Sequence, residues 1–456
     1  MDKQSVIRIA NAQGFWGDSA LGPRQILAEE QIDYITFDYL AEVSMSILQK
    51  QRMQNPDMGY AQDFVNMIKK VMPVCKERGI KIVANAAGVN ATACLNNTKN
   101  ALKELGLFGT KIAIVEGDDI LGQLDQLIKN GQELKNMESG KALKSVLQKV
   151  TSANVYIGAR PIVEALNKGA DIVITGRVSD PSLTLAPLVY EFKWSMDDYD
   201  RLAAGTIMGH LLECGTQATG GNYTDWKKVS GFANMGFPIV EAQAGGSFVL
   251  TKVKNTGGLV TIATATSQLL YEISDPENYL GPDCIADFTS IQLTQEGENR
   301  VAFSNIKGKP PTSNYKVSIS YEKGYKILST LCVSGPDAIE KANLMYNMVF
   351  ARLSMHGIDI PEQDRFLEIF GTNVLYKGLV PTNPQPHEVL VRIGAKGPDA
   401  KSLNVLGSEI APLITSGPPG ITGFAGGRAR AKAIVGYWPA LIEKTKVNTT
   451  VWVEEI

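Results

Sequence analysis

A repeated pattern of short apolar segments constrains the fold of this 456-residue chain more than any other feature. In its first half, runs rich in β-branched residues are each followed by a Gly- or Asn-rich turn and then by a stretch with helical spacing. We therefore expect six strands, at residues 5–12, 32–39, 80–87, 111–116, 154–158 and 171–175. Strands that are apolar throughout are covered on both faces, and strands alternating with helices favour a parallel sheet. The pattern predicts an α/β fold whose sheet is mainly parallel, Rossmann-like and doubly wound, with a barrel as the alternative.

The pattern changes near Gly231. Residues 237–262 and 285–320 alternate apolar and polar side chains between polar turns, which is typical of antiparallel strands. Beyond them the sequence predicts a helix at 337–353 and a strand at 388–393. Near the end we expect a turn at Trp438-Pro439 and a last strand at 447–453.

Length and pattern together predict three parts, because domains cluster around ~100–200 residues. We expect a parallel α/β domain at residues 1–228 that carries the site, and a β-rich α+β domain at 229–370. A C-terminal α/β segment at 371–456 is expected to pack on the rest.

Charge and cysteine content exclude several functional classes. The 45 basic and 47 acidic residues are interspersed, so the basic surface that binds nucleic acid is not expected. The five cysteines are scattered, without the spacing of a zinc site or of a disulfide framework. No run approaches the ~20 apolar residues of a membrane helix, and the start lacks a signal-peptide core. We therefore expect a cytoplasmic protein that binds a small molecule and no metal.

Polar turns after the strands are the first candidates for a site, because ligands of doubly wound sheets bind at the carboxyl ends of strands. Residues 14–18 lack the GxGxxG fingerprint of dinucleotide binding, yet Gly17 and Asp18 could contact a substrate. The glycines could equally serve only to allow positive φ. Asn85 and Asn90 could present amides to a phosphate or carboxylate, or could cap the next helix.

Two later turns carry charge. Carboxylates at residues 116–119 form either a solvated turn or, with Asp118 and Asp119, part of a metal site, to which Asp180 is a further candidate. Arg177 directly follows a buried strand, where an unpaired cation is costly. Asp180 could pair with it, but we favour Arg177 as a bidentate anchor for a substrate carboxylate or phosphate, with Asp180 as a catalytic residue.

A predicted helix at 209–215 carries a third group of candidates. His210, Glu213 and Cys214 share one face, because they are three and four residues apart. The imidazole could lower the thiol pKa and make Cys214 a nucleophile, or His210 or Glu213 could act as general acid or base; a buried cysteine without a chemical role is the alternative. The following turn offers donors to a substrate oxyanion: Thr219, Gly220, Gly221 and Asn222.

Taken together, these segments resemble the acyclic terpene utilisation (AtuA) family, in order and over nearly the whole chain. The resemblance lies in residues 14–18, 85–90, 171–180, 209–215, 219–222, 257–261, 270–273, 275–276, 282–283 and 286–288. It implies a role in breaking down branched acyl chains such as those of citronellol and geraniol, whose intermediates are coenzyme A thioesters.

The resemblance therefore implies an enzyme that acts on a small carboxylate or an acyl-CoA thioester, as a lyase, hydratase or hydrolase. Coenzyme A would then be part of the substrate, and no other cofactor is implied. The alternative is a non-catalytic ligand-binding or scaffold subunit of an acyl-CoA-processing complex. Many members carry a further C-terminal module that this sequence lacks, so we expect a homo-oligomer that could work with a separate small subunit.

Overall fold

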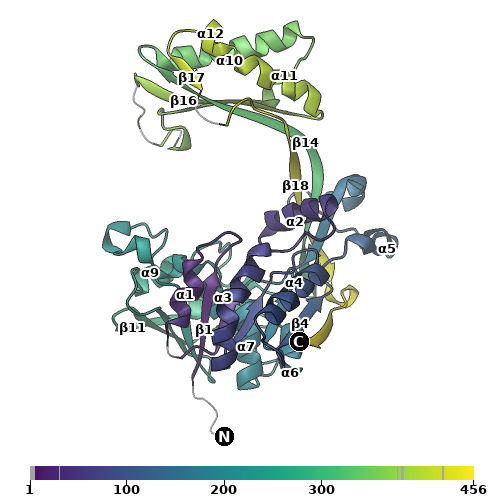
Figure 1. Ribbon diagram of the computed structural model, residues 1–456, viewed down its shortest axis with the longest axis vertical. Helices are drawn as coiled ribbons and strands as arrows, with labels where there is room; N and C mark the ends of the chain where they lie inside the picture. Colours follow the sequence, from purple (N-terminus) through teal and green to yellow (C-terminus); the bar gives the residue numbers. More distant parts are fainter. Residues whose placement is uncertain (1–5, 30, 377, 380, 382–384, 424–425) are drawn as a thin grey trace. The chain divides into compact units, whose positions relative to one another are not determined.

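The computed structural model describes residues 6–29, 31–376, 378–379, 381, 385–423 and 426–456 (Figure 1). Contacts divide the chain into two compact units, one of Met1–Ser320 with Tyr437–Ile456 and one of Tyr321–Gly436. The chain leaves the first unit within β14 (Asn314–Ser334) and returns within β18 (Lys432–Glu443), which pairs with β14. Each unit has its own hydrophobic core.

A ten-stranded mixed sheet forms the centre of the first unit, in the order β11-β12-β8-β7-β1-β2-β3-β6-β4-β19. The central strands pair in parallel: β1 (Val6–Gln13), β2 (Tyr34–Phe37), β3 (Lys81–Ala84), β6 (Ile172–Thr175) and β4 (Lys111–Glu116). The flanking strands pair antiparallel: β7 (Pro238–Gln243), β8 (Phe248–Lys252), β12 (Arg300–Ser304), β11 (Gln292–Gly297) and β19 (Thr450–Glu455). The α/β fold is thus confirmed, but only the centre of the sheet is parallel, and the Rossmann-like winding stays a prediction.

The helices of the first unit form two contact groups. One comprises α1 (Leu21–Leu27), α3 (Gln62–Arg78) and α4 (Ala91–Glu104), and Figure 1 shows α3 and α4 side by side. The other comprises α6 (Arg160–Asn167), α7 (Ser182–Phe192), α8 (Tyr199–Glu213) and α9 (Ile262–Leu269). The remaining helices are α2 (Glu42–Gln54) and α5 (Leu124–Lys129). The apolar residues of α3 recur every three or four positions and are buried, as the sequence predicts.

Two expected elements of the first unit are wrong. The strand expected at 154–158 is β5 (Val150–Val155), which pairs with β14 rather than with the parallel strands. The turn expected at Trp438-Pro439 lies inside β18. Proline has no N–H to donate to a neighbouring strand, but the Pro439 carbonyl accepts a hydrogen bond from Met137 N at 2.9 Å.

The contact-defined units also differ from the three expected ranges. Strand β7 pairs with β1, so residues after 229 extend the first sheet instead of starting a domain. A small sheet in the same unit has the order β13-β10-β9 and contains β13 (Lys307–Lys309), β10 (Ile285–Asp287) and β9 (Tyr279–Leu280).

The second unit follows the order β14, α10, β15, β16, α11, β17 along the chain. Its strands pair in the order β15-β16-β14-β17, which is the split βαβ arrangement of ferredoxin-like folds. Its further elements are α10 (Ala338–Met355), β15 (Arg365–Phe370), β16 (Glu388–Gly397), α11 (Ala400–Ile410), α12 (Leu413–Ser416) and β17 (Ile421–Gly423). Both the helix expected at 337–353 and the strand expected at 388–393 are confirmed, as α10 and β16.

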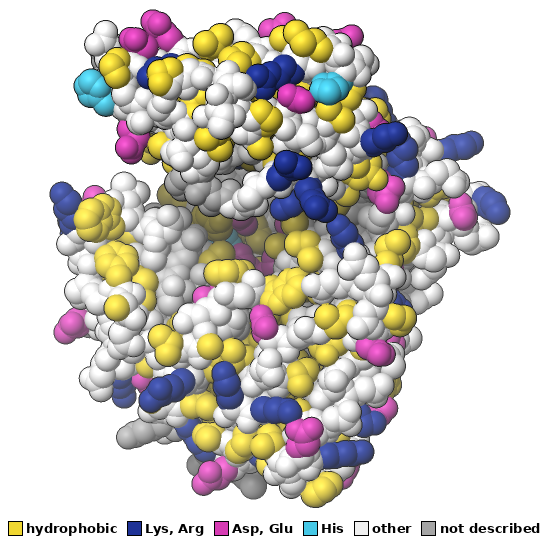
Figure 2. Space-filling view, turned by 45° about the horizontal axis from the view of Figure 1, so that its top comes forward, with side chains coloured by type: hydrophobic (Ala, Val, Ile, Leu, Met, Phe, Trp, Pro, Cys, Tyr) yellow, Lys and Arg dark blue, Asp and Glu magenta, His cyan; other side chains and the backbone are white. Residues whose placement is uncertain are grey.

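The surface carries both signs of charge, and basic and acidic side chains occur together across the face in Figure 2. Among the described helices, none has the length and apolar character needed to cross a bilayer.

Candidate functional site

A cavity of about 420 Å³ in the first unit is lined by several ionisable groups whose pKa values are shifted. Its polar lining includes Glu42, Asp180, His210, Glu213, Glu272 and Lys316. Tyrosines at 156, 279 and 315 also line it, and so do apolar side chains such as Met137, Leu280 and Leu441. Ionisable groups with shifted pKa values in a concave site are typical of catalytic centres.

Helix α8 places His210 and Glu213 beside this cavity. The helix can approach the start of α7 because Gly209 has no side chain: a Cβ there would lie 2.4 Å from Cα of Pro181. His210 is 1% exposed. Its Nδ1 lies 3.1 Å from Oε1 of Glu213, and its Nε2 lies 3.0 Å from the carbonyl oxygen of Gln268.

These contacts define where the protons of His210 can lie. A carbonyl oxygen only accepts, so Nε2 carries a proton that it donates to Gln268. One further proton is then shared between Nδ1 and the Glu213 carboxylate. Burial raises the pKa of Glu213 to about 7, although the hydrogen bond from His210 opposes this. Burial alone would lower the pKa of His210, but the hydrogen bond and charge of Glu213 outweigh it and raise that pKa.

The second oxygen of Glu213, Oε2, is buried and has no hydrogen-bond partner among the described residues. A buried carboxylate oxygen is normally satisfied, and an exception calls for an explanation such as an absent ligand or a catalytic role. The His210–Glu213 pair therefore combines a shared proton with an unpartnered carboxylate oxygen in a residue that lines the cavity.

Arg177 lies behind the cavity and does not line it. Its side chain is 1% exposed, and its Nη1 and Nη2 lie 2.7 and 3.1 Å from the two carboxylate oxygens of Asp180. A third contact runs from Nη1 to the Leu40 carbonyl, and the guanidinium stacks 4.2 Å above the Tyr156 ring. Asp180 thus takes the place of the expected substrate anion, and Arg177 holds two cavity-lining side chains, Asp180 and Tyr156.

Asp180 carries another carboxyl group that lines the cavity. Burial raises its pKa above the ordinary value, and the charge of Arg177 only partly offsets this. Asp38, which lies nearby, has its pKa raised by burial and then by the charge of Asp180. A raised pKa favours the protonated form of a carboxyl group, and that form can donate to a substrate oxygen.

Glu42, another residue that lines the cavity, interacts with Tyr156 and Lys316. The Tyr156 hydroxyl donates to Glu42 at 2.7 Å, and the Lys316 ammonium lies 3.2 Å from the same carboxylate. Burial opposes ionisation of Glu42, but these hydrogen bonds and charges outweigh it and lower its pKa to about 2. Glu42 therefore stays ionised and differs from Glu213 in the role it can play.

The asparagines predicted to bind substrate instead connect parts of the framework. Asn85 is fully buried, accepts a hydrogen bond from Tyr39 N at 2.6 Å and donates to Asp38 at 2.6 Å. Asn90 caps α4 by accepting from Ala93 N and donates to two backbone carbonyls of the preceding loop. Neither lines the cavity.

The first turn packs against the end of α8. A Cβ at Gly14 would lie 2.7 Å from the backbone of Cys214. Asp18 accepts from Gly14 N at 2.9 Å, and Gly17 has a φ of +98°. Gly17 and Asp18 thus shape the turn that supports α8, and neither lines the cavity.

The turn after α8 is held by its own hydrogen bonds. Thr219 is buried and its hydroxyl donates to the Gly236 carbonyl at 2.7 Å. Gly220 has a φ of +100°, and Gly221 N donates to the Thr216 carbonyl at 3.0 Å. Asn222 lines a separate shallow hollow. These residues lie outside the cavity, so the donors predicted for an oxyanion are not beside His210.

Cys214 caps the C-terminal end of α8. Both nitrogens of His210 have other partners, Glu213 and Gln268, so the imidazole does not activate the thiol. Burial and the charge of Glu213 raise the pKa of Cys214, which is the opposite of what a thiolate nucleophile needs.

Sequence reasoning thus placed Asp180, His210 and Glu213 in one site but missed several neighbours. Glu272 lies in a stretch that carried the family resemblance, which was a usable signal. Glu42 and Lys316 had none, because each is a single polar residue within an ordinary helix or strand, and Tyr156 is a single residue directly after β5.

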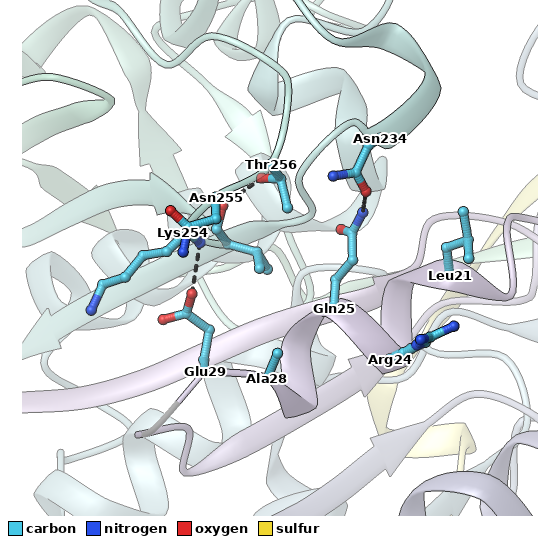
Figure 3. A pocket seen from close by; sticks show the side chains of 10 residues that line it. Leu21, Arg24, Gln25, Ala28, Glu29, Asn234, Lys254, Asn255 and Thr256 are labelled. Carbon is cyan, nitrogen blue, oxygen red and sulfur yellow. Dashed lines mark hydrogen bonds between the residues drawn. The ribbon is translucent and has the colours of Figure 1, made fainter.

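A larger hollow of about 540 Å³ lies between α1 and residues 253–256 (Figure 3). Its polar groups satisfy one another: Gln25 donates to Asn234 at 2.9 Å, and Glu29 accepts from Lys254 N at 2.6 Å. The side chains of Arg24 and Lys254 extend in different directions in Figure 3, so they do not form one anion site. We therefore place the candidate site in the smaller cavity.

No group of three or more His, Cys, Asp or Glu side chains in the described part of the chain is arranged to hold a metal ion. Asp118 instead accepts hydrogen bonds from Arg177 N at 2.8 Å and from Asn154 at 2.9 Å.

Comparison with known proteins identifies the family. The sequence model described as acyclic terpene utilisation family protein AtuA matches residues 7–453. No curated protein and no solved structure is significantly similar to the chain. The match extends over the cavity and both structural units, and the chain therefore belongs to the acyclic terpene utilisation (AtuA) family.

Proposed function

We propose that the protein is an enzyme that moves protons on a small carboxylate or acyl-CoA thioester during the breakdown of branched acyl chains. The observation that carries the proposal is the buried His210–Glu213 pair, which lines a cavity and has an unpartnered carboxylate oxygen. Proton transfer to or from a substrate contributes typically ~10²–10⁴-fold to catalysis, and it works best with a group whose pKa lies near the working pH.

The cavity also suits an acyl chain. Three large apolar side chains that line it are exposed, namely Met137 at 57%, Leu280 at 65% and Leu441 at 46%. Exposed apolar groups gathered at one opening commonly mark a binding site. They would cover the hydrocarbon part of a substrate, and its carboxyl or thioester end would lie toward His210 and Glu213.

Among the reaction classes, a lyase or hydratase fits these residues best. Such reactions need a base and an acid on the carbons next to a carbonyl, and Glu213 and Asp180 are carboxyl groups with raised pKa values in one cavity. A hydrolase using a thiol is disfavoured, because the pKa of Cys214 is raised.

The test is turnover of a panel of acyl thioesters, such as crotonyl-CoA, methylcrotonyl-CoA and geranyl-CoA, followed by mass spectrometry of the products. We expect addition or loss of water for at least one of them, and loss of that activity in Glu213→Gln. Binding without any turnover would favour the non-catalytic ligand-binding alternative. Absence of both binding and turnover across the panel would refute the proposed substrate class.

A further inference from the structure

Tyr279 is held beside the His210–Glu213 pair by a small sheet and two rings. It lies in β9, which pairs antiparallel with β10, where Tyr279 is opposite Ala286. Its ring centroid lies 5.8 Å from that of His210 and 5.1 Å from that of Phe288. Phe288 in turn packs edge-on against His210, at 5.4 Å. The three rings fix one another, so Tyr279 has little freedom to turn away.

The hydroxyl of Tyr279 is available to a ligand. Tyr279 lines the cavity and is half-buried, and no described residue gives its hydroxyl a hydrogen-bond partner. Among the neighbouring charges, those of Glu213 and then Asp180 act most strongly on it. Burial and these negative charges raise the pKa of Tyr279, so the hydroxyl keeps its proton and acts as a donor.

The other cavity tyrosines differ from Tyr279 in their surroundings. The Tyr156 hydroxyl already donates to Glu42 at 2.7 Å. Tyr315 lies close to Asp283, with the Lys444 ammonium 5.2 Å from its ring, and makes no ring contact with His210. Among these three, only Tyr279 combines an unpartnered hydroxyl with contact to His210.

We propose that Tyr279 is a further catalytic residue, whose hydroxyl donates a hydrogen bond to the carbonyl oxygen of the substrate. The inference rests on the proposed function. When Glu213 takes a proton from the carbon next to the carbonyl, the electrons of the broken C–H bond form a C=C bond. The carbonyl electron pair then moves to oxygen, and Tyr279 stabilises this negative charge without losing its proton. Donors aimed at such an oxyanion are among the largest contributions to catalysis.

Tyr279 supplies the hydrogen-bond donor to an oxyanion that the sequence predicted at residues 219–222. These lie outside the cavity, whereas Tyr279 and Asp180 both line it. Asp180 has both carboxylate oxygens against the Arg177 guanidinium, so Tyr279 is the less restrained of the two.

Acetoacetyl-CoA provides the test, because its enolate absorbs ultraviolet light and the neutral ketone does not. We expect the wild-type protein to increase the enolate fraction of bound acetoacetyl-CoA. Tyr279→Phe, which keeps the ring against His210, should bind the thioester but lower the enolate-to-ketone ratio by about tenfold or more, and should lower turnover about 100-fold. Tyr190→Phe makes the same chemical change on α7, outside the cavity, and should leave both unchanged.

An enolate fraction in Tyr279→Phe equal to that of the wild type would overturn the role of Tyr279 and leave the proposed function standing. An equal loss in Tyr190→Phe would also overturn it, because the effect would then not depend on a hydroxyl beside His210. A wild-type protein that does not bind acetoacetyl-CoA would instead contradict the acyl-thioester function, and the inference with it.

Discussion

His210 and Glu213 share one proton: Nδ1 of His210 lies 3.1 Å from Oε1 of Glu213, and the Gln268 carbonyl, 3.0 Å from Nε2, keeps the opposite nitrogen protonated. Moving the shared proton between the two side chains does not change the net charge of the pair. Such a pair can sit in a buried site without the full cost of an isolated charge, and it still offers Glu213 as a base.

The pH dependence of activity should follow Glu213. As a base it must be ionised, and burial raises its pKa to about 7, so kcat should rise as the pH increases through about 7. His210→Asn keeps a donor toward Glu213 but removes the positive charge that lowers the pKa of Glu213. The rise should therefore move to higher pH in this variant, as measured by a pH–rate profile. A profile that does not move would mean that Glu213 is not the group being titrated.

Cys214 should be dispensable for chemistry. Its pKa is raised by burial and by Glu213, and His210 does not contact its thiol. We expect Cys214→Ala to keep kcat within about threefold of the wild type, because only a small half-buried thiol is removed. Alkylation of the wild type followed by mass spectrometry gives a second measurement. A loss of kcat by about 100-fold or more with unchanged thermal stability would show that the thiol is a nucleophile after all.

Asp118 should make the protein less stable as the pH rises. Burial raises its pKa to about 7, against the hydrogen bonds from Arg177 N and Asn154. The folded state therefore holds a proton that the unfolded state releases, so this stability is complete below the ordinary pKa of an aspartate and is lost as the pH rises through about 7. The effect is roughly 3–4 kcal/mol.

Thermal unfolding at about pH 4 and about pH 8 measures this effect. Asp118→Asn removes the titration and should flatten the difference, whereas Asp225→Asn, at an exposed surface pair with Lys228, should not change it. The assignment to Asp118 fails if both variants show the same pH dependence as the wild type.

Asn85 should contribute to stability and not to substrate binding. Asn85→Ala leaves the Tyr39 N–H and the Asp38 carboxylate without partners in the core, at a cost of about 2–5 kcal/mol. Asn97→Ala, which removes a single bond to the Ala93 carbonyl at a half-buried site, should cost about 1 kcal/mol or less. Urea unfolding measures both changes. A raised KM with unchanged stability in Asn85→Ala would restore the predicted binding role.

Much of the central sheet could be predicted from the sequence, because its strands are short apolar runs that no other structure explains well. The prediction for β4 matches its observed bounds, and β6 differs by one residue. The antiparallel flanks were recognised as strands, but their partners were not. Whether β7 pairs with β1 or begins a new domain depends on contacts between residues more than 200 positions apart, which local patterns do not encode.

The site could be predicted only where chemically suitable side chains also lie close together in the sequence. His210 and Glu213 are one helical turn apart, so their contact follows from local geometry. The pairing of Arg177 with Asp180 was open, because an arginine after a strand can face either a neighbour or a ligand. Tyr279 could not be predicted, because β9 is too short to show a periodic pattern. Only the fold brings its ring into contact with His210.

The central claim is that the His210–Glu213 pair moves a proton on a bound acyl thioester. Hydrogen exchange tests it most directly: isovaleryl-CoA is incubated with the protein in deuterium oxide, and deuterium on the carbon next to the carbonyl is measured by mass spectrometry. The account predicts exchange with the wild type and a rate about 100-fold or more lower with Glu213→Gln, in which the amide cannot take up the proton. Equal exchange rates for the two proteins, or no exchange above the protein-free rate with the wild type, would contradict it.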